Sequence, residues 1–119
     1  MEYTSQFEAW WTGLSEEEQD KIDASVGLLE KLGPNVPFPH SSGLKSRHGR
    51  MRELRVQIHG NPFRILYAFD ARRAASLLLG GDKTGDGRWY DVNIPLAEDL
   101  YDQHLAALAE ERRRKKGSP

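Results

Sequence analysis

The sequence predicts a single α+β domain with two N-terminal helices, an antiparallel sheet built around one hairpin, and a C-terminal helix. Apolar residues recur at helical spacing near both ends of the chain and alternate with polar residues in the middle, which is the basis of this prediction. A chain of 119 residues, 38% of them hydrophobic, suits one modest core. We expect the domain to span residues 1–111 and residues 112–119 to form a basic, disordered tail.

Two short helices are expected to open the chain. Ser5 with Glu8, and Ser15 with Glu18, fit the capping-box spacing that satisfies free backbone amides at a helix start. Each pair is followed by an apolar stripe at helical spacing, namely Phe7, Trp10, Trp11 and Leu14 in the first helix and Ile22, Val26, Leu29 and Leu32 in the second. A Gly-Pro pair ends the second helix, and the segment 36–49, rich in Pro, Ser and Gly, is predicted to be an exposed loop.

Two strands follow at residues 52–58 and 63–70, around a turn at residues 59–62. Apolar residues stand at every second position, namely Leu54, Val56 and Ile58 in the first strand and Phe63, Ile65, Tyr67 and Phe69 in the second. If Ile58 lies opposite Phe63, the apolar residues of both strands fall on the same side of the sheet. The predicted hairpin therefore has one apolar side, and Arg55, Gln57 and Arg64 lie on the opposite side.

The side of the hairpin opposite its apolar residues carries two arginines. In the predicted register Gln57 opposes Arg64, and Arg55 lies on the diagonal about 7 to 8 Å away. The two guanidiniums are expected to converge on the open face. A third strand at residues 74–81 and a helix that starts at Pro95 complete the predicted fold.

The net charge of −1 conceals a strong segregation of charge along the chain. Residues 1–34 contain two basic and eight acidic residues, and residues 35–73 contain eight basic and two acidic residues. Residues 74–119 are nearly balanced. A folded domain can present the positive middle segment to a polyanion as one patch.

Several classes of protein are excluded by what the sequence lacks. The chain contains no cysteine, which excludes disulfides, a thiol nucleophile and cysteine-liganded zinc. No apolar run approaches the roughly 18 to 20 residues of a membrane span, and the first residues are acidic and polar, unlike a signal peptide. We therefore expect a cytoplasmic protein that makes no contact with a membrane.

A dense run of cations lies in the predicted loop and the first strand of the hairpin. Its members are Lys45, Arg47, His48, Arg50, Arg52 and Arg55. Binding to nucleic-acid phosphates would offset the mutual repulsion of these charges. The alternative is a basic loop that is simply solvated.

Arg55 and Arg64 are a sharper candidate for a functional site. Paired guanidiniums can clamp a phosphate and stabilise the extra negative charge of a pentacovalent transition state. Cross-strand ion pairs with Glu53 or Asp70 are the structural alternative.

A glycine-rich loop at residues 80–91 leaves the third strand and carries Lys83, Trp89 and Tyr90. Its aromatic side chains could stack on the bases of single-stranded RNA, with Tyr90 as the preferred residue. Trp89 could instead anchor the last helix in the core. The loop is similar to a calcium-binding loop, but Asn93 stands where that motif requires glutamate, and the lysine lacks the spacing of a phosphate-binding P-loop.

His48 is the histidine expected nearest to the cationic site. Neighbouring cations favour its neutral imidazole, which makes it a candidate general base, with an ordinary surface histidine as the alternative. The four histidines are scattered without metal-ligand spacing, so neither a metal site nor another cofactor is expected.

Three segments follow one another in a characteristic order: Arg52-Glu53-Leu54-Arg55, then Phe63-Arg64-Ile65-Leu66-Tyr67, then Leu77-Leu78-Leu79 running into a lysine-bearing loop and a final helix. In this order they resemble the RelE/HigB superfamily, particularly its phage-derived HigB-like branch. The resemblance covers about residues 2–109. It implies the RelE-like fold, a small curved antiparallel sheet packed against two N-terminal helices, with a C-terminal helix.

The same resemblance implies an activity. Members of this family are toxins of type II toxin–antitoxin systems that enter the ribosomal A site and cut messenger RNA without a metal ion. The ribose 2′-hydroxyl attacks the adjacent phosphate and leaves a 2′,3′-cyclic phosphate and a 5′-hydroxyl. The family also implies a cognate antitoxin, often a helix-turn-helix DNA-binding protein, through which alone the pair reaches its operator DNA.

Site residues follow from the resemblance as well. Arg55 and Arg64 would hold the scissile phosphate, and Lys45 or His48 would assist proton removal. Lys83 and Tyr90 would complete the catalytic site. The remaining RNA contacts are expected at Arg47, Arg50, Arg52 and Trp89.

Two further functions remain open on the same sequence. A ParE-like toxin binds and poisons DNA gyrase without cleaving RNA, although such a protein has no need of a phosphate clamp formed by Arg55 and Arg64. A catalytically inactive nucleic-acid-binding module is the other alternative. It is suggested by the acidic residues Asp82, Asp86 and Asp91 beside the proposed site.

Overall fold

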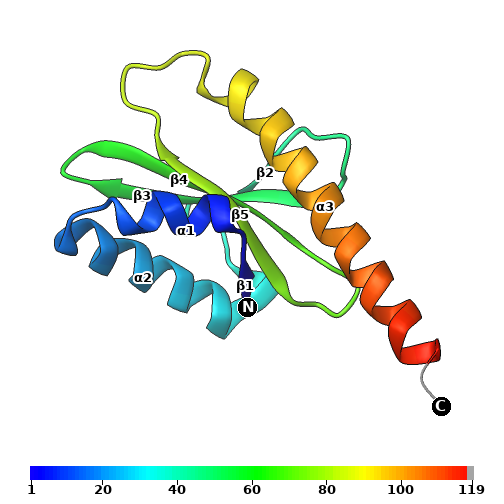
Figure 1. Cartoon of the computed structure of the whole chain (residues 1–119). Coiled ribbons are helices and arrows are strands. Elements are labelled where there is room, and N and C mark those ends of the chain that lie inside the picture. Colours follow the sequence, from blue (N-terminus) through cyan, green and yellow to red (C-terminus); the bar gives the residue numbers. More distant parts are fainter. Residues whose placement is uncertain (118–119) are drawn as a thin grey trace.

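A computed structural model of the chain describes residues 1–117. It contains one five-stranded sheet in the order β1-β5-β4-β3-β2 (Figure 1). The strands are β1 (Glu2–Tyr3), β2 (Ser41–Gly43), β3 (Met51–Ile58), β4 (Asn61–Phe69) and β5 (Ala75–Asp82), and the helices are α1 (Ser5–Thr12), α2 (Glu16–Leu32), the 3₁₀ turn η1 (Gly33–Asn35) and α3 (Trp89–Gly117). The predicted α+β class with two N-terminal helices and one C-terminal helix is confirmed.

The N-terminal helices and α3 pack on opposite faces of the sheet, as Figure 1 shows. Two successive glycines of β5 lie against helices on the two faces, because successive residues of a strand point to opposite faces. A Cβ at Gly80 would meet the ring of Trp10 from α1 at 2.3 Å, and a Cβ at Gly81 would meet the ring of Trp89 from α3 at 2.8 Å. The absence of side chains lets one tryptophan lie on each face of the same strand.

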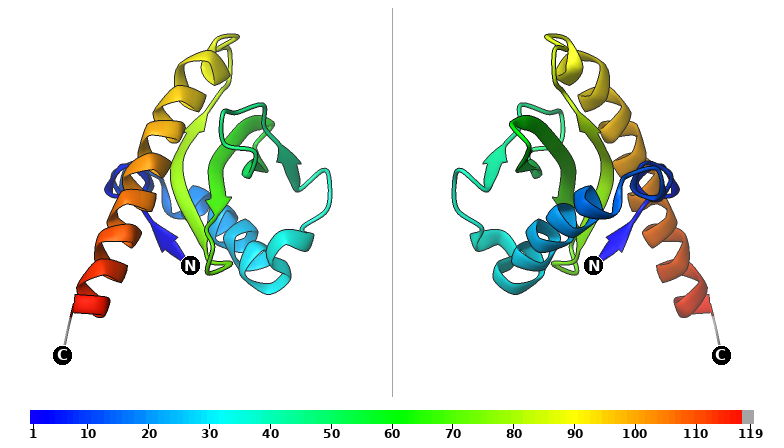
Figure 2. Two further views of the ribbon diagram at one scale, coloured as in Figure 1. Left: turned by 90° about the vertical axis from the view of Figure 1, so that its right-hand side faces the viewer. Right: turned by 90° about the vertical axis from the view of Figure 1, so that its left-hand side faces the viewer.

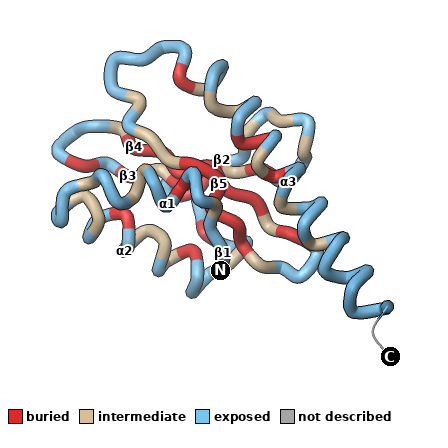
Figure 3. Tube along the Cα trace, in the orientation of Figure 1, coloured by how far each residue is buried: buried red, intermediate tan, exposed pale blue. Residues whose placement is uncertain are grey.

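Each face has its own hydrophobic core. The core under α1 and α2 includes Phe7, Ile22, Leu29, Leu54, Ile65 and Tyr67, and the core under α3 includes Met51, Leu66, Ala68, Leu78, Trp89 and Tyr101. Figure 3 shows that the buried residues concentrate on the central strands. These strands therefore form the rigid support for the side chains that project from the sheet.

The β3–β4 hairpin closes through a two-residue turn, His59-Gly60. Both residues have positive φ values, 52° and 79°, as in the turn type that matches the right-handed twist of a hairpin. Ile58 consequently pairs with Asn61 and not with Phe63. The predicted register is wrong by two residues.

A shift of two residues leaves every side chain of the hairpin on its predicted face. It changes the partner of Arg64, which lies directly opposite Arg55 and not opposite Gln57. The two arginines are therefore closer in register than the sequence predicts.

Two edge strands extend the sheet beyond the three predicted strands. β1 runs parallel to β5, so the sheet is mixed and not entirely antiparallel. β2 pairs with β3 and lies within the segment 36–49 that was expected to be an exposed loop. Ser41 of β2 is fully buried and shares a hydrogen bond of 2.6 Å with the Tyr67 hydroxyl, which ties this segment to the core.

The N-terminal helix starts follow local capping. Ser15 and Glu18 form the predicted capping box of α2. The cap of α1 is Thr4 and not Ser5, because the Thr4 hydroxyl accepts the hydrogen bond from the Phe7 amide.

The last helix is longer at both ends than the sequence predicts. α3 begins at Trp89, ahead of Pro95, and continues to Gly117, so residues 112–117 are helical where a disordered tail was expected. Ion pairs at helical spacing, such as Lys115 with Glu111, support these final turns. Residues 118–119 of the expected tail lie outside the described residues. None of the described helices is long and apolar enough to cross a bilayer.

Candidate active site

Arg55 and Arg64 are direct partners across the β3–β4 hairpin. Paired residues on antiparallel strands have Cβ atoms about 4.5 to 5.5 Å apart, so the two side chains leave the same face of the sheet side by side. This is the α3 side, because Gly81, which pairs with Arg64, faces Trp89. The left view of Figure 2 shows α3 along this face, where it contacts β5 and β4, whereas α2 packs on β3 from the other face.

Arg64 is buried, with only 4% of the residue exposed, and three contacts fix it. Its Nη1 donates to the Phe63 carbonyl at 3.0 Å, and its Nε donates to the Tyr90 hydroxyl at 3.3 Å. Nε also lies 3.8 Å from Oε1 of Glu53. The alternative, an ion pair with Glu53, is therefore present, but within residues 1–117 the Nη2 of Arg64 donates no hydrogen bond.

Arg55 lies in a different environment from its partner. It is half-buried, and among the described residues no carboxylate pairs with it. Its guanidinium carbon lies 5.4 Å from the centre of the Phe38 ring. Arg55 therefore contributes an uncompensated positive charge beside the fixed guanidinium of Arg64.

Tyr90 and Lys83 bring the β5–α3 loop to the same place. The Lys83 ammonium lies 5.5 Å from the centre of the Tyr90 ring, and the Lys83 amide donates to the Pro62 carbonyl at 3.0 Å. Burial raises the pKa of the Tyr90 hydroxyl, the Glu53 carboxylate raises it further, and the Arg64 guanidinium opposes both. At neutral pH Tyr90 therefore keeps its proton, so its hydroxyl can donate a hydrogen bond as well as accept the one from Arg64.

Glu53 is a member of this cluster that the sequence analysis considered only as an ion-pair alternative. It is 4% exposed, and its Oε2 is buried without a hydrogen-bond partner among the described residues. Burial of a carboxylate is unfavourable unless a cation lies close to it, and the Arg64 guanidinium, with Nε 3.8 Å from Oε1, is the cation that offsets this cost. The alternation of β3 already places Glu53 on the face of Arg55, which was the signal in the sequence.

Trp89 is not available for the RNA stacking that the sequence suggested. It is only 6% exposed and lies in the core under α3, where its ring packs against Gly81. The core-anchor alternative therefore describes Trp89. Its position at the start of α3 fixes the neighbouring Tyr90, whose ring meets the Trp89 ring edge-on at 5.3 Å.

The loop between β2 and β3 is held against the middle of α3, away from Tyr90. His48 Nε2 lies 2.8 Å from Oδ1 of Asp102, and its ring packs edge-on against Tyr101 at 4.8 Å. Tyr101 follows Tyr90 by eleven residues on α3, about 16 Å along the helix axis. His48 thus faces a carboxylate in place of the expected cations and is not brought to the Arg55 cluster.

Arg47 is neutralised by acidic residues of α3. Its guanidinium contacts Glu98, Asp99 and Asp102. Hydrogen bonds to Asp102 and Asp99 raise the pKa of Arg47. The Arg47 backbone amide also donates to Glu98 at 2.7 Å, so this arginine anchors the loop and its charge is engaged within the protein.

The other cations of the basic segment are divided between the two faces of the sheet. Arg52 points to the α1 and α2 side, where its Nε donates to the Ser41 hydroxyl at 3.1 Å, so it does not share a face with Arg55. Lys45 and Arg50 are exposed on the loop. Of the six residues proposed as catalytic, four therefore gather at one place: Arg55, Arg64, Lys83 and Tyr90.

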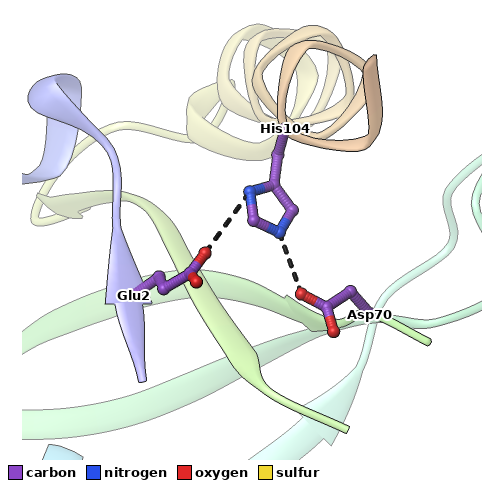
Figure 4. Close-up of side chains that lie close together, drawn as sticks. All are labelled: Glu2, Asp70 and His104. Atoms are coloured by element: carbon purple, nitrogen blue, oxygen red, sulfur yellow. Dashed lines mark hydrogen bonds and ion pairs between the residues drawn. The ribbon is translucent and has the colours of Figure 1, made fainter. Parts of the chain in front are cut away.

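One group of potential metal ligands lies outside this cluster. Oxygen or nitrogen atoms of Glu2, Asp70 and His104 lie within 4.8 Å of one another (Figure 4). Arg72 binds both carboxylates, with Nη2 at 2.8 Å from Glu2 and 2.7 Å from Asp70. The group is therefore charge-compensated by an arginine and joins β1, the end of β4 and α3.

The cluster of Arg55, Arg64, Lys83 and Tyr90 offers chemistry suited to an anion. It combines three cationic side chains with a protonated phenol, and the buried carboxylate of Glu53 lies beside it. Guanidiniums bind phosphate oxygens through charge-assisted hydrogen bonds, and these bonds strengthen where negative charge develops.

Comparison with known proteins identifies the family. Residues 9–102 match the family model described as phage derived protein Gp49-like (DUF891). The chain is 38% identical over 116 residues to HigB2 and 40% identical over 104 residues to HigB3, two Mycobacterium tuberculosis proteins that carry toxin names. These matches cover 92% and 86% of the chain, but 58% of HigB2 and 90% of HigB3. The resemblance to the phage-derived HigB-like branch is confirmed, and the chain belongs to the Gp49-like family of phage-derived proteins.

Proposed function

We propose that the protein is the toxin of a type II toxin–antitoxin pair and that it cleaves messenger RNA on the ribosome. The observation that carries this proposal is the direct pairing of Arg55 with Arg64 beside Tyr90 and Lys83. Its family relatives HigB2 and HigB3, which carry toxin names, support the toxin assignment. The proposed partners are a cognate antitoxin, through which operator DNA is reached, and the ribosome with its message.

The proposed reaction is an internal phosphoryl transfer. The ribose 2′-oxygen attacks the adjacent phosphorus and forms a new P–O bond, while the bond from phosphorus to the 5′-oxygen breaks. The 2′-hydroxyl loses a proton and the 5′-oxygen gains one. The products are a 2′,3′-cyclic phosphate and a 5′-hydroxyl, so the step balances without a metal ion or co-reactant.

The cluster can stabilise the transition state of this reaction through charge. Arg55 and the Nη2 of Arg64 would donate to the non-bridging phosphate oxygens, where negative charge increases. Tyr90, which keeps its proton because its pKa is raised, is the proposed donor toward the leaving oxygen. Lys83 would complete the cationic wall beside it.

The loop that carries Lys45 and His48 has a different proposed role. His48 is fixed to Asp102 near the middle of α3, away from Arg55 and Arg64. Its proposed role is therefore contact with the RNA strand beyond the scissile phosphate, in place of removing the proton of the 2′-hydroxyl. Exposed Lys45 and Arg50 on the same loop would contribute to that contact.

The test is to induce the wild-type chain and an Arg55→Ala variant in cells without an antitoxin and to map RNA 5′ ends. Arg55 is preferred to Arg64 for this test because loss of Arg64 would leave Glu53 buried without its cation. New ends within translated codons, present for the wild type and absent for Arg55→Ala, support the proposal. Arg114→Ala, which alters an exposed arginine at the far end of α3, is the matched control and should still cleave.

Three results would contradict the proposal. Intact messages with broken or relaxed DNA would assign the gyrase-poisoning function. Normal growth after induction of a folded wild-type chain would assign the inactive nucleic-acid-binding module. Equal cleavage by wild type and Arg55→Ala would remove the phosphate clamp from the mechanism.

A further inference from the structure

We propose that the ring of Phe38 is a stacking platform for a base of the RNA strand whose phosphate is held by Arg55 and Arg64. The inference rests on the nuclease function proposed above and adds a binding subsite to it. The ligand is a nucleobase of single-stranded RNA, recognised by its flat π face.

Phe38 is the most exposed large apolar side chain of the described chain. It is 71% exposed, compared with 59% for Tyr3 and 55% for Val92. Contact with an aromatic ligand would remove this apolar surface from water. The ring has the area and the open face that a base requires.

The backbone holds Phe38 at a defined position beside β3. The Pro37 carbonyl accepts hydrogen bonds from the amides of His40 at 3.0 Å and Ser41 at 3.1 Å, which closes a turn around Phe38. The His40 carbonyl accepts a hydrogen bond of 2.9 Å from the Arg55 amide, which ties this turn to the strand of the proposed clamp.

Phe38 and Arg55 together match the layout of a nucleotide. The Arg55 guanidinium carbon lies 5.4 Å from the ring centre, within the range of a cation–π contact. A nucleotide likewise carries its phosphate and its base one ribose apart. A phosphate bound by the guanidinium would therefore bring its own or the adjacent base next to the ring.

The other aromatic residues near the cluster are already engaged. Trp89 is buried against Gly81, and the Tyr90 ring is in contact with Trp89 and with the Lys83 ammonium. Phe38 is thus the ring beside the clamp that keeps an open face. Stacking of this kind accepts every base, so Phe38 would add affinity and position without selecting a codon.

The test uses Phe38→Trp, which keeps an aromatic ring and reports stacking through its fluorescence. The probe is a short single-stranded 2′-O-methyl oligoribonucleotide, which cannot be cut because its 2′-oxygen is blocked. After subtraction of the wild-type spectrum, we expect the fluorescence of the introduced indole to be quenched on addition of the oligonucleotide. Inorganic polyphosphate, which supplies phosphates without bases, should bind without this quenching.

Affinity provides the second measurement. Phe38→Leu, which keeps apolar volume but removes the π face, should weaken oligonucleotide binding about tenfold. It should leave polyphosphate binding unchanged. Tyr3→Ala, which removes an exposed ring on β1, is the control and should bind both ligands like the wild type.

Two outcomes would overturn the inference: equal quenching by polyphosphate and oligonucleotide, or unchanged oligonucleotide affinity in Phe38→Leu. Neither result depends on cleavage, which is measured separately on ribosomes with the wild-type chain. If messages are cut but no base-dependent quenching is seen, the stacking subsite is refuted and the nuclease function stands. If the quenching is seen but no message is cut, the proposed nuclease function is refuted and the stacking subsite stands.

Discussion

Arg55 and Arg64 face each other across one hairpin, yet Arg64 is buried against Glu53 and Tyr90 while Arg55 contacts the exposed ring of Phe38. The Arg64 guanidinium is therefore fixed by the fold, while the Arg55 guanidinium is more exposed and is not held by a carboxylate of the described residues. Loss of the two side chains should have different effects on stability and activity.

Arg55→Ala should lower the rate of RNA cleavage about a hundredfold or more, which is typical for loss of one donor to a developing oxyanion. Its free energy of unfolding should change by less than about 0.5 kcal/mol, because Arg55 is half-buried and unpaired with carboxylates among the described residues. Arg64→Ala should lower the cleavage rate too. In addition, its free energy of unfolding should fall by about 3 to 5 kcal/mol, because Glu53 would stay buried without its cation. Urea unfolding and single-turnover cleavage measure both effects, and equal stability losses in the two variants would refute this difference.

Glu53→Gln should lower the pKa of Tyr90. Burial is the largest cause of the raised Tyr90 pKa and remains in the variant, while the contribution of the Glu53 carboxylate is removed. The Tyr90 pKa should therefore fall, because the Arg64 guanidinium that lowers it is left in place. Alkaline absorbance titration measures it, with Tyr90→Phe to identify the signal, and a pKa that is unchanged or higher would show that the carboxylate does not act on this hydroxyl.

Gly80→Ala and Gly81→Ala should each destabilise the fold by about 1 to 3 kcal/mol. The new Cβ would meet the Trp10 ring at 2.3 Å in the first variant and the Trp89 ring at 2.8 Å in the second. Gly87→Ala is the matched control, since a Cβ there meets no atom within 4 Å. If urea midpoints fell equally for all three variants, close packing of the tryptophans would not be the cause.

Asp70→Asn should have a lower free energy of unfolding than the wild type at neutral pH, and this free energy should depend less on pH in the acid range. Burial alone would raise the pKa of Asp70, but hydrogen bonds from Arg72 and His104 and the charge of Arg72 outweigh burial and hold the pKa well below its usual range. A carboxyl with a depressed folded-state pKa stabilises the protein above its unfolded pKa of about 3.9, and this contribution is lost as pH falls toward the folded value. The wild type should therefore lose stability from about pH 4 downward.

The expected difference at pH 7 is about 2 kcal/mol, as for a buried charge-assisted hydrogen bond. Between about pH 4 and pH 2 the stability of Asp70→Asn should fall less steeply than that of the wild type. Asp20→Asn alters an exposed carboxylate of α2 and should follow the wild-type curve. Parallel acid unfolding curves for Asp70→Asn and the wild type would contradict the assignment.

Much of the fold was predictable from local patterns. The capping box of Ser15 and Glu18 marks the start of α2, and alternation in β3 and β4 assigns each hairpin side chain to a face. That alternation places Arg55 and Arg64 together and also separates Arg52 from them, although its charge suggested a shared role. The family resemblance follows from the order of the same segments along the chain.

The site was only partly predictable. The charge pattern predicted that Lys45, Arg47 and His48 lie close to Arg55 and Arg64. In the structure, Arg47 and His48 instead contact acidic residues of α3. Trp89 and Tyr90 are adjacent in sequence, yet one is buried in the core and the other meets Arg64. Neither difference is visible in the residue types, because each depends on where α3 lies against the sheet.

The sequence by itself determined the two N-terminal helices, the three central strands and the face that each hairpin residue takes, because these features depend on the spacing of apolar residues along the chain. The tertiary structure alone decided that Ile58 pairs with Asn61, that the Arg64 guanidinium meets the Tyr90 hydroxyl, and that Phe38 reaches Arg55. The physical reason is that register is set by the backbone geometry of a two-residue turn, and contacts between distant residues are set by the packing of α3 and the loops on the sheet.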